Sequence, residues 1–311
     1  MLRSAATIYL LVSLFGAGVL CEIAIHPPRR PIAAEDIHPE MVGAGYRASV
    51  QEHSIVAADG AHLFGSLVLP RRYNGDAVII LHGVSDNRLG AEGFAGDFLP
   101  EGYIVLLPDA RAHGESGGKY ATYGVIEKDD IRRWIDWLEV NTSPRCVYLL
   151  GESMGAATAI QATAADPRIC ATVAESPFET FREVAYERIG QMTNTGPWLG
   201  KTIARPMVEL AFVFARLRTG VWLTDASPLR AIQHTHAPIL LIHGAADTHI
   251  APANSQALFN AARDHAELWI VPRAEHCGAS SVQPEEFHRR VVGWFDSHRA
   301  NSAAAGHASA Q

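Results

Sequence analysis

A serine flanked by two glycines stands between a predicted strand and a predicted helix, and this junction constrains the fold more than any other segment. Residues Gly151 to Gly155 (Gly-Glu-Ser-Met-Gly) follow the apolar run Val147 to Leu150 and precede the alanine-rich segment Ala156 to Ala165. A strand, a sharp turn and a helix in this order hold the serine hydroxyl clear of the sheet edge. A side chain in place of Gly151 or Gly155 would collide with the neighbouring helix or strand. We therefore predict that Ser153 is a nucleophile on a strained turn.

The chain supplies two partners for this serine further along. A serine hydroxyl is a poor nucleophile until a neighbouring base takes its proton. Asp247 follows an apolar run that begins at Ala237 and predicts a buried parallel strand, and His276 follows the apolar run Leu268 to Val271. Both residues lie beyond the carboxyl ends of strands, where open α/β sheets place their ligands. The order Ser153, Asp247, His276 predicts a catalytic triad, in which Asp247 orients His276 and His276 transfers the protons.

Several short motifs together resemble those of the α/β-hydrolase superfamily, and within it the serine hydrolases allied to the Bem46-type proteins and the prolyl-oligopeptidase-like esterases. The motifs are Leu81 to Gly83, Asp109 to Ser116, Gly151 to Gly155, His243 to Asp247, and Glu275 with His276. The resemblance covers about residues 45 to 298. It implies a mostly parallel central sheet with helices on both faces and a helical cap insertion. It says little about the substrate, because one fold hosts many reactions.

The resemblance also indicates where backbone groups would stabilise a negatively charged oxygen. The predicted strand that begins at Ala77 ends in His82 and Gly83. In this fold the loop after that strand supplies one N–H donor, and the residue after the nucleophile supplies the other. We therefore expect the oxyanion hole to consist of the N–H groups of Val84 and Met154, which act on charge that develops in the transition state.

Glu175 competes with Asp247 for the role of the catalytic acid. It follows the predicted strand at residues 170–174, so it also lies at the edge of the sheet where the site is expected. The alternative for Glu175 is a carboxylate at the pocket rim or one that anchors the cap. Activity of Asp247→Asn and Glu175→Gln variants would separate these assignments.

The order of strands and helices predicts one hydrolase domain over residues 45–298, preceded by a linker at 26–44 and followed by a disordered tail at 299–311. Two alternating apolar and polar segments on either side of Asp59 and Gly60 predict an antiparallel hairpin. From Ala77 onward, strands alternate with helices, which predicts a parallel sheet covered on both faces.

Between residues 177 and 236 this alternation stops, and helical patterns rich in aromatic residues predict a cap over the site. Taken singly, each aromatic side chain is expected to belong to the core of the cap. Together they favour an apolar pocket for an acyl chain or leaving group. The aromatic residues are Phe178, Phe181, Trp198, Phe212, Phe214 and Trp222.

The first 25 residues predict a membrane anchor or a signal segment. Seventeen residues without a charge, Ala5 to Cys21, follow Arg3 and Ser4, and this length suits a signal anchor or the apolar part of a signal peptide. No Ala-x-Ala cleavage site follows, so we expect an uncleaved anchor with an exported catalytic domain. Cleaved secretion and a buried cytoplasmic helix remain as alternatives. Basic residues on both sides of the segment leave its orientation open.

The four cysteines and the charged residues exclude several other classes of protein. Cys146 and Cys170 begin predicted neighbouring strands, where a disulfide or two buried thiols are both possible, whereas Cys277 is expected to be a packing residue. No metal-binding spacing of cysteine and histidine occurs, and His234 with His236 is expected at the surface, so we predict no metal and no cofactor. The net charge of −7 argues against nucleic-acid binding.

From these observations we expect a membrane-anchored serine esterase that acts on a small-molecule ester or a lipid-like ester. A peptidase or amidase and an acyltransferase remain open, because the same triad serves each of them. A binding protein on a hydrolase scaffold is the alternative outside the enzymes, although such a protein would have no need of Ser153, Asp247 and His276 together.

Overall fold

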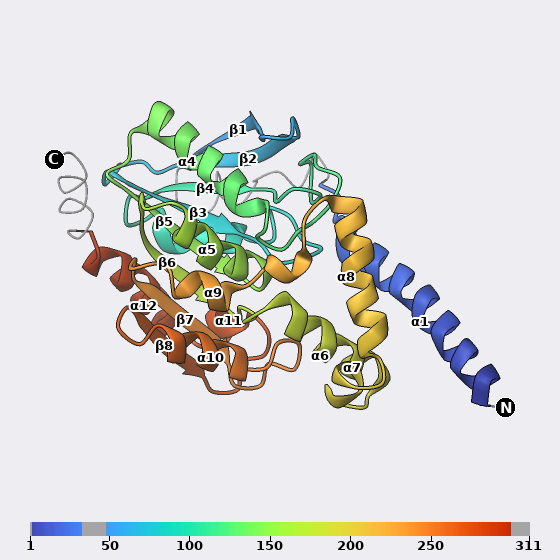
Figure 1. The fold of residues 1–311 in the computed structure, drawn as a ribbon. Helices are drawn as coiled ribbons and strands as arrows, with labels where there is room; N and C mark the ends of the chain where they lie inside the picture. Colours follow the sequence, from blue (N-terminus) through green and yellow to red (C-terminus); the bar gives the residue numbers. More distant parts are fainter. Residues whose placement is uncertain (1, 33–47, 300–311) are drawn as a thin grey trace.

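An eight-stranded sheet forms the centre of the computed structural model, which describes residues 2–32 and 48–299 (Figure 1). Its strands lie in the order β1-β2-β4-β3-β5-β6-β7-β8. β1 pairs antiparallel with β2 and β2 with β4, whereas all neighbours from β4 to β8 are parallel. The bounds are β1 (Ser49–Val56), β2 (His62–Leu69), β3 (Asp76–Leu81), β4 (Ile104–Pro108), β5 (Cys146–Glu152), β6 (Ile169–Glu175), β7 (Ile239–Gly244) and β8 (Ala266–Val271).

This topology confirms the predicted α/β fold and its antiparallel start. The hairpin of β1 and β2 turns where the sequence predicts, and the N–H of Gly60 donates to the carbonyl of Ala57 within the turn. Residues 33–44 of the predicted linker and residues 300–311 of the predicted tail lie outside the described residues.

Helices cover both faces of the sheet because the side chains of each buried strand alternate between two apolar layers. Val78 and Ile80 pack with the aromatic side chains of α3 and α12, whereas Ile79 packs with α4. One face carries α4 (Glu127–Thr142), α5 (Met154–Ala165), α9 (Pro228–Ile232) and α10 (Ala253–Ala261). The other carries η2 (Glu92–Phe94), α3 (Ala95–Phe98), α11 (Ala279–Val282) and α12 (Pro284–Ser297).

Four further elements between β6 and β7 form a separate layer, and we call them the cap helices. They are α6 (Phe181–Thr193), α7 (Trp198–Lys201), α8 (Arg205–Thr219) and η3 (Leu223–Asp225). Phe178, Phe181 and Phe212 are buried in a shared apolar core with Met154, which follows the predicted nucleophile. The layer therefore lies over the carboxyl edge of the sheet, where the site is expected.

The N-terminal segment forms one long helix, α1 (Leu2–Ile25), which lies beside α8 and projects away from the domain (Figure 1). Residues Ser4–Ile25 are long and apolar enough to cross a membrane, and an 18-residue window within them has a mean hydropathy of 2.2. At about 1.5 Å per residue, 22 residues span about 33 Å, close to the thickness of the hydrocarbon layer of a bilayer. The same properties suit a signal peptide or a core helix.

Cys146 and Cys170 form a disulfide between the first residue of β5 and the second residue of β6. Their Cα atoms lie 5.8 Å apart, within the usual range for such a bond. The sequence is compatible with either a disulfide or two buried thiols at these positions, and the structure contains the disulfide. Disulfides persist mainly in oxidising compartments.

Candidate active site

Ser153 occupies the sharp turn between β5 and α5, with φ 51° and ψ −113°. This φ lies in the left-handed region, which is strained for a serine and turns its side chain away from the helix. The turn needs glycine on both sides. A Cβ at Gly151 would overlap the backbone of Gly155, and a Cβ at Gly155 would overlap the backbone of Leu81. Close approach of β3, β5 and α5 thus accounts for the predicted glycine pair.

The side chains of Ser153, His276 and Asp247 form a continuous chain of hydrogen bonds. His276 Nε2 lies 2.9 Å from Ser153 Oγ, and His276 Nδ1 lies 2.7 Å from Asp247 Oδ2. Each residue follows the carboxyl end of a different strand: β5, β7 and β8. The structure therefore brings together the three residues that the sequence order predicts, at distances that allow proton transfer between Ser153 and His276.

The side chain of Asp247 is fully buried, and several donors hold its carboxylate in place. The backbone N–H groups of His249 and Ile250 each donate to Oδ1 at 2.9 Å. Burial by itself would raise the pKa of Asp247. The hydrogen bonds from His243, His276 and Ile250 outweigh burial and hold the pKa far below its ordinary value. Asp247 is therefore ionised at neutral pH and can stabilise a protonated His276.

His243 supports this carboxylate from the end of β7, and sequence reasoning assigned it no role. Its Nε2 donates to the carbonyl of Ile250 at 2.9 Å and lies 3.3 Å from Asp247 Oδ2. Its Nδ1 lies 2.7 Å from Ser255 Oγ, so the serine hydroxyl donates to that nitrogen. A histidine at the buried end of a strand, four residues before the predicted acid, was the signal available in the sequence.

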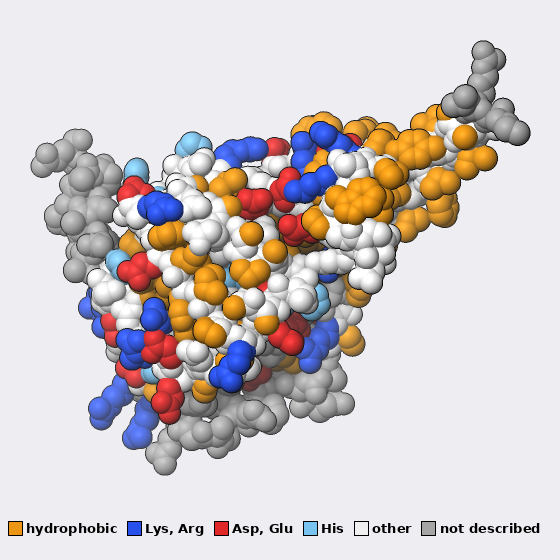
Figure 2. Space-filling view, turned by 90° about the horizontal axis from the view of Figure 1, so that it is seen from below, with side chains coloured by type: hydrophobic (Ala, Val, Ile, Leu, Met, Phe, Trp, Pro, Cys, Tyr) orange, Lys and Arg blue, Asp and Glu red, His pale blue; other side chains and the backbone are white. Residues whose placement is uncertain are grey.

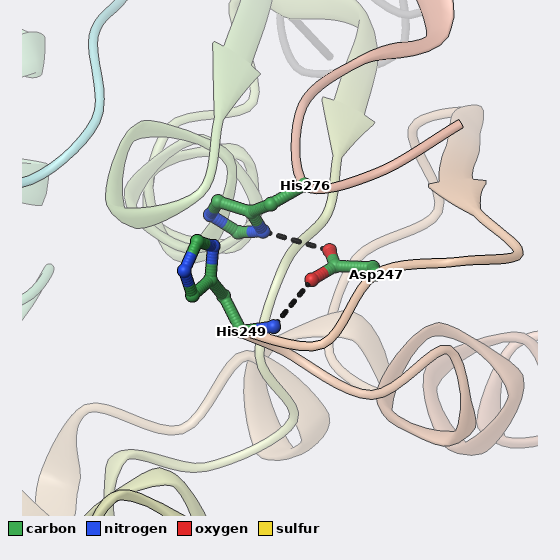
Figure 3. Close-up of side chains that lie close together, drawn as sticks. All are labelled: Asp247, His249 and His276. Carbon is green, nitrogen blue, oxygen red and sulfur yellow. Dashed lines mark hydrogen bonds and ion pairs between the residues drawn. The ribbon is translucent and has the colours of Figure 1, made fainter. Parts of the chain in front are cut away.

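His249 is a second histidine that the sequence did not single out, and it lies beside the predicted pair of Asp247 and His276 (Figure 3). The rings of His249 and His276 meet edge to face, with centroids 5.3 Å apart. One possible ligand atom from each of the three residues lies within 4.8 Å of the others. Both oxygens of Asp247 already accept hydrogen bonds, so a cation there would compete with the contact to His276. The absence of a metal stays a prediction.

Two glutamates lie close to the nucleophile: Glu152 is half-buried and Glu175 is buried. The carboxyl group of each accepts a hydrogen bond from a backbone N–H. Glu152 Oε1 accepts the N–H of Gly83 at 3.4 Å. Glu175 Oε1 accepts the N–H of Ala279 at 2.8 Å, three residues after His276. Burial raises the pKa of both carboxyl groups to about 7. Glu175 thus fixes the loop that carries His276, whereas the bond to the His276 ring comes from Asp247.

The residues predicted to form the oxyanion hole lie next to the nucleophile. Val84 and Met154 line the same cavity as Ser153. The loop after β3 passes close to the nucleophile, because a Cβ built on Gly83 would lie 3.6 Å from Ser153 Cβ. Ser85 has φ 64°, so this loop also contains a left-handed turn. The loop that contains Val84 and the start of α5 at Met154 therefore both lie close to the Ser153 side chain.

The cavity above Ser153 has a volume of about 360 Å³ and an apolar lining. Side chains from α6, α8 and the end of α1 surround it, and Arg188 is the one charged residue among the described residues that line it. Phe178, Phe181 and Phe212, which the sequence assigned to the cap, are among the lining residues. Trp198 is exposed instead. Such a cavity suits an apolar ligand group placed next to the hydroxyl.

Comparison with known proteins shows the family and the fold of the chain. A model of the alpha/beta hydrolase family matches residues 78–290. The uncharacterized protein YqkD of Bacillus subtilis is 31% identical over 224 residues, which are 71% of this chain and 71% of that protein. The uncharacterized protein Rv2307c of Mycobacterium tuberculosis is 28% identical over 222 residues, which are 70% of this chain and 67% of that protein.

Among solved structures, the esterase Pf2001 of Pyrococcus furiosus superposes with a TM-score of 0.70. The two sequences are 26% identical, and the match covers 88% of this chain and 100% of that chain. The likeness therefore extends over the whole domain rather than over the central sheet alone.

Proposed function

Because the chain belongs to the alpha/beta hydrolase family, as its match over residues 78–290 shows, we propose that it is a serine hydrolase that cleaves carboxylic esters. The observation that carries this proposal is the hydrogen-bonded chain of Ser153, His276 and Asp247, with its distances of 2.9 and 2.7 Å. Its position at the base of an apolar cavity and the likeness to an esterase of Pyrococcus furiosus support ester chemistry.

In the proposed reaction, Ser153 Oγ attacks the ester carbonyl carbon while His276 Nε2 takes the hydroxyl proton. The carbonyl oxygen becomes an oxyanion, which the N–H groups of Val84 and Met154 would stabilise. The tetrahedral intermediate then collapses, the carbon–oxygen bond to the alcohol breaks, and His276 protonates the departing alcohol. An acyl group remains bound to Ser153.

Water then hydrolyses the acyl-enzyme, and His276 again acts first as base and then as acid. His276 takes a proton from the water molecule, the hydroxide oxygen attacks the acyl carbon, and the bond to Ser153 breaks. The acid leaves, and His276 returns a proton to Ser153. Asp247 stays ionised throughout and stabilises the cationic form of His276, in keeping with its strongly lowered pKa.

We further propose that α1 is an uncleaved membrane anchor and that the catalytic domain lies outside the cytoplasm. The length and mean hydropathy of Ser4–Ile25 support an anchor. The disulfide between Cys146 and Cys170 supports an oxidising compartment. Secretion after cleavage is the alternative, and it would remove the helix that packs beside α8.

The test is the reaction of the purified full chain with a fluorophosphonate probe, together with hydrolysis of p-nitrophenyl acetate, butyrate and octanoate. We expect the Ser153→Ala variant to lose labelling and turnover. The matched control is Ser85→Ala, which removes another hydroxyl from the same cavity and should still be labelled. Labelling without ester turnover would favour a peptidase, amidase or acyltransferase. Absence of labelling in folded protein would favour a binding protein.

A further inference from the structure

The carboxyl end of α1 forms one wall of the cavity above Ser153. Leu20, Cys21, Ile23 and Ala24 line the cavity from α1, and Pro27 and Pro28 line it from the segment that follows. The cap helices line the other side, mainly through apolar side chains of α6 and α8. A segment in which the sequence predicts an anchor, a signal or a buried helix is thus part of the cavity wall.

Several hydrogen bonds join this end of α1 to the catalytic domain. The hydroxyl of Tyr123 donates to the carbonyl of Ala24 at 2.7 Å. The N–H of Ala121 donates to the carbonyl of Ile25 at 3.0 Å. The guanidinium of Arg29 donates to two carbonyls of the loop at residues 116–118, each at 3.1 Å. These contacts fix the position of the wall relative to Ser153.

One face of α1 also packs closely against α8. The residues on this face recur every fourth position and are buried: Ser13, Ala17, Cys21 and Ile25. At Gly16 the helices are so close that an added Cβ would overlap the side chain of Met207. An ion pair of 2.6 Å between Glu22 and Arg218 lies at the other end of the contact. The small side chains on α1 allow this close approach.

The opposite face of α1 is apolar and exposed. Figure 2 shows it as a continuous hydrophobic surface on the projecting helix. More than two-fifths of each of its large side chains is accessible, which suits contact with lipid rather than water. These residues are Ile8, Leu11, Val12, Phe15 and Val19. α1 therefore has one face for the protein and one for a bilayer.

We propose that α1 is a permanent wall of an acyl-binding pocket, and that the substrate is an ester with a medium or long aliphatic acyl chain. The chain would lie between Ala24 and the cap helices, with its ester carbonyl next to Ser153. This inference rests on the proposed ester hydrolysis. The lining is apolar, and Arg188 is its one charged residue in the part of the chain that the structure describes, which favours an uncharged aliphatic group over a peptide or a polar acyl group.

The experiment compares acyl-chain preference in the full chain held in lipid nanodiscs, using p-nitrophenyl acetate, butyrate and octanoate. Each methylene group that leaves water in the pocket raises kcat/KM by up to about fourfold. The wild type is therefore expected to prefer octanoate over butyrate by more than about tenfold. Ala24→Trp fills the wall side of the pocket and should lower the octanoate-to-acetate ratio of kcat/KM by about tenfold or more.

Two further variants make the result decisive. Val19→Trp adds the same side chain to the exposed face of α1, outside the cavity, and should leave the ratio unchanged. Leu20→Ala enlarges the pocket without a clash and should shift the preference toward longer acyl chains. If Ala24→Trp does not fold, the chain preference of Leu20→Ala tests the role of α1.

Each outcome separates this inference from the proposed function. A wild type that hydrolyses acetate but not octanoate would overturn the role of α1 while ester hydrolysis stands. So would a chain preference that Leu20→Ala leaves unchanged and that Ala24→Trp, where it folds, also leaves unchanged. A wild type that hydrolyses none of the esters would overturn the proposed function, and the inference with it.

Discussion

Replacement of Asp247 by asparagine tests the triad with little change in shape. The asparagine side chain would keep an oxygen that can accept the N–H groups of His249 and Ile250, which donate at 2.9 Å in the native protein. Its amide nitrogen would then replace Oδ2, the atom that lies 2.7 Å from His276 Nδ1. An amide nitrogen donates hydrogen bonds, so Nδ1 of His276 would have to lose its hydrogen to keep the contact.

The expected loss of kcat follows from the tautomer of His276 that this substitution imposes. With its proton on Nε2, His276 would point a donor at Ser153 Oγ, 2.9 Å away, and could no longer take the hydroxyl proton. A triad locked in the wrong tautomer loses a factor of about 10³ to 10⁴ in kcat, or about 4 to 5.5 kcal/mol of transition-state stabilisation. Substrate binding should change little, because Asp247 does not line the cavity.

The assay is steady-state hydrolysis of p-nitrophenyl butyrate by Asp247→Asn and Glu175→Gln, with circular dichroism to confirm folding. Glu175 is the matched control, since its carboxyl is also buried at the end of a strand but accepts its hydrogen bond from the backbone of Ala279. We expect Glu175→Gln to keep at least about a tenth of the activity. Loss of activity in Glu175→Gln with near-native kcat in Asp247→Asn would refute the assignment of the acid.

Three further predictions concern stability. The pKa values of Glu152 and Glu175 are raised to about 7, against 4.5 for an ordinary glutamate. Between these pH values the folded protein therefore binds more protons than the unfolded chain. Its free energy of unfolding should fall as pH rises through this window. Urea titrations at several pH values should show a smaller fall in Glu175→Gln, and an equal fall would contradict this origin. The disulfide closes a loop with a sequence separation of 24, so the Cys146→Ala/Cys170→Ala variant should lose about 3 kcal/mol and about 6 to 12 °C in Tm. An unchanged Tm by calorimetry under non-reducing conditions would argue against the bond. Gly155→Ala should cost at least about 2 kcal/mol in urea unfolding, whereas Gly293→Ala, with open space around its Cβ on α12, should gain about 0.5 to 1 kcal/mol. Equal effects of the two substitutions would contradict the close packing at the elbow.

The sequence predicts the central sheet and the neighbourhood of the candidate triad because both depend on local patterns. Apolar runs mark β5, β7 and β8, and parallel strands bring their carboxyl ends to one edge. Ser153, Asp247 and His276 each follow one of those ends, so their proximity follows from the order of the elements. The catalytic roles of the three residues stay predictions until activity is measured.

Other features depend on the path of a loop or on contacts between segments that are distant in the sequence, and the pattern of apolar and polar residues does not determine them. The contact of His243 with Asp247 requires the path of the loop after β7, which curves back so that Ile250 reaches the same carboxylate. The wall that α1 forms requires residues near position 24 to meet α8, almost two hundred residues later. An apolar N-terminal segment suits an anchor, a signal or a core helix equally well.

The pairing of Cys146 with Cys170 also needed three-dimensional information. The sequence places both cysteines near the start of neighbouring strands, but a register shift of one residue would turn one side chain to the opposite face. The pairing of β5 with β6 contains an irregularity after Val147, and only the resulting register shows that the two sulfur atoms meet.

Ser153 is proposed to form a covalent acyl-enzyme with a carboxylic ester. The most direct test of this step is rapid acid quenching of the full chain during hydrolysis of p-nitrophenyl butyrate, followed by peptide mass spectrometry. We expect a butyryl group on the peptide that contains Ser153, and no such adduct in Ser153→Ala. Ester turnover that proceeds at the same rate in Ser153→Ala, or an acyl group found on a different residue, would contradict it.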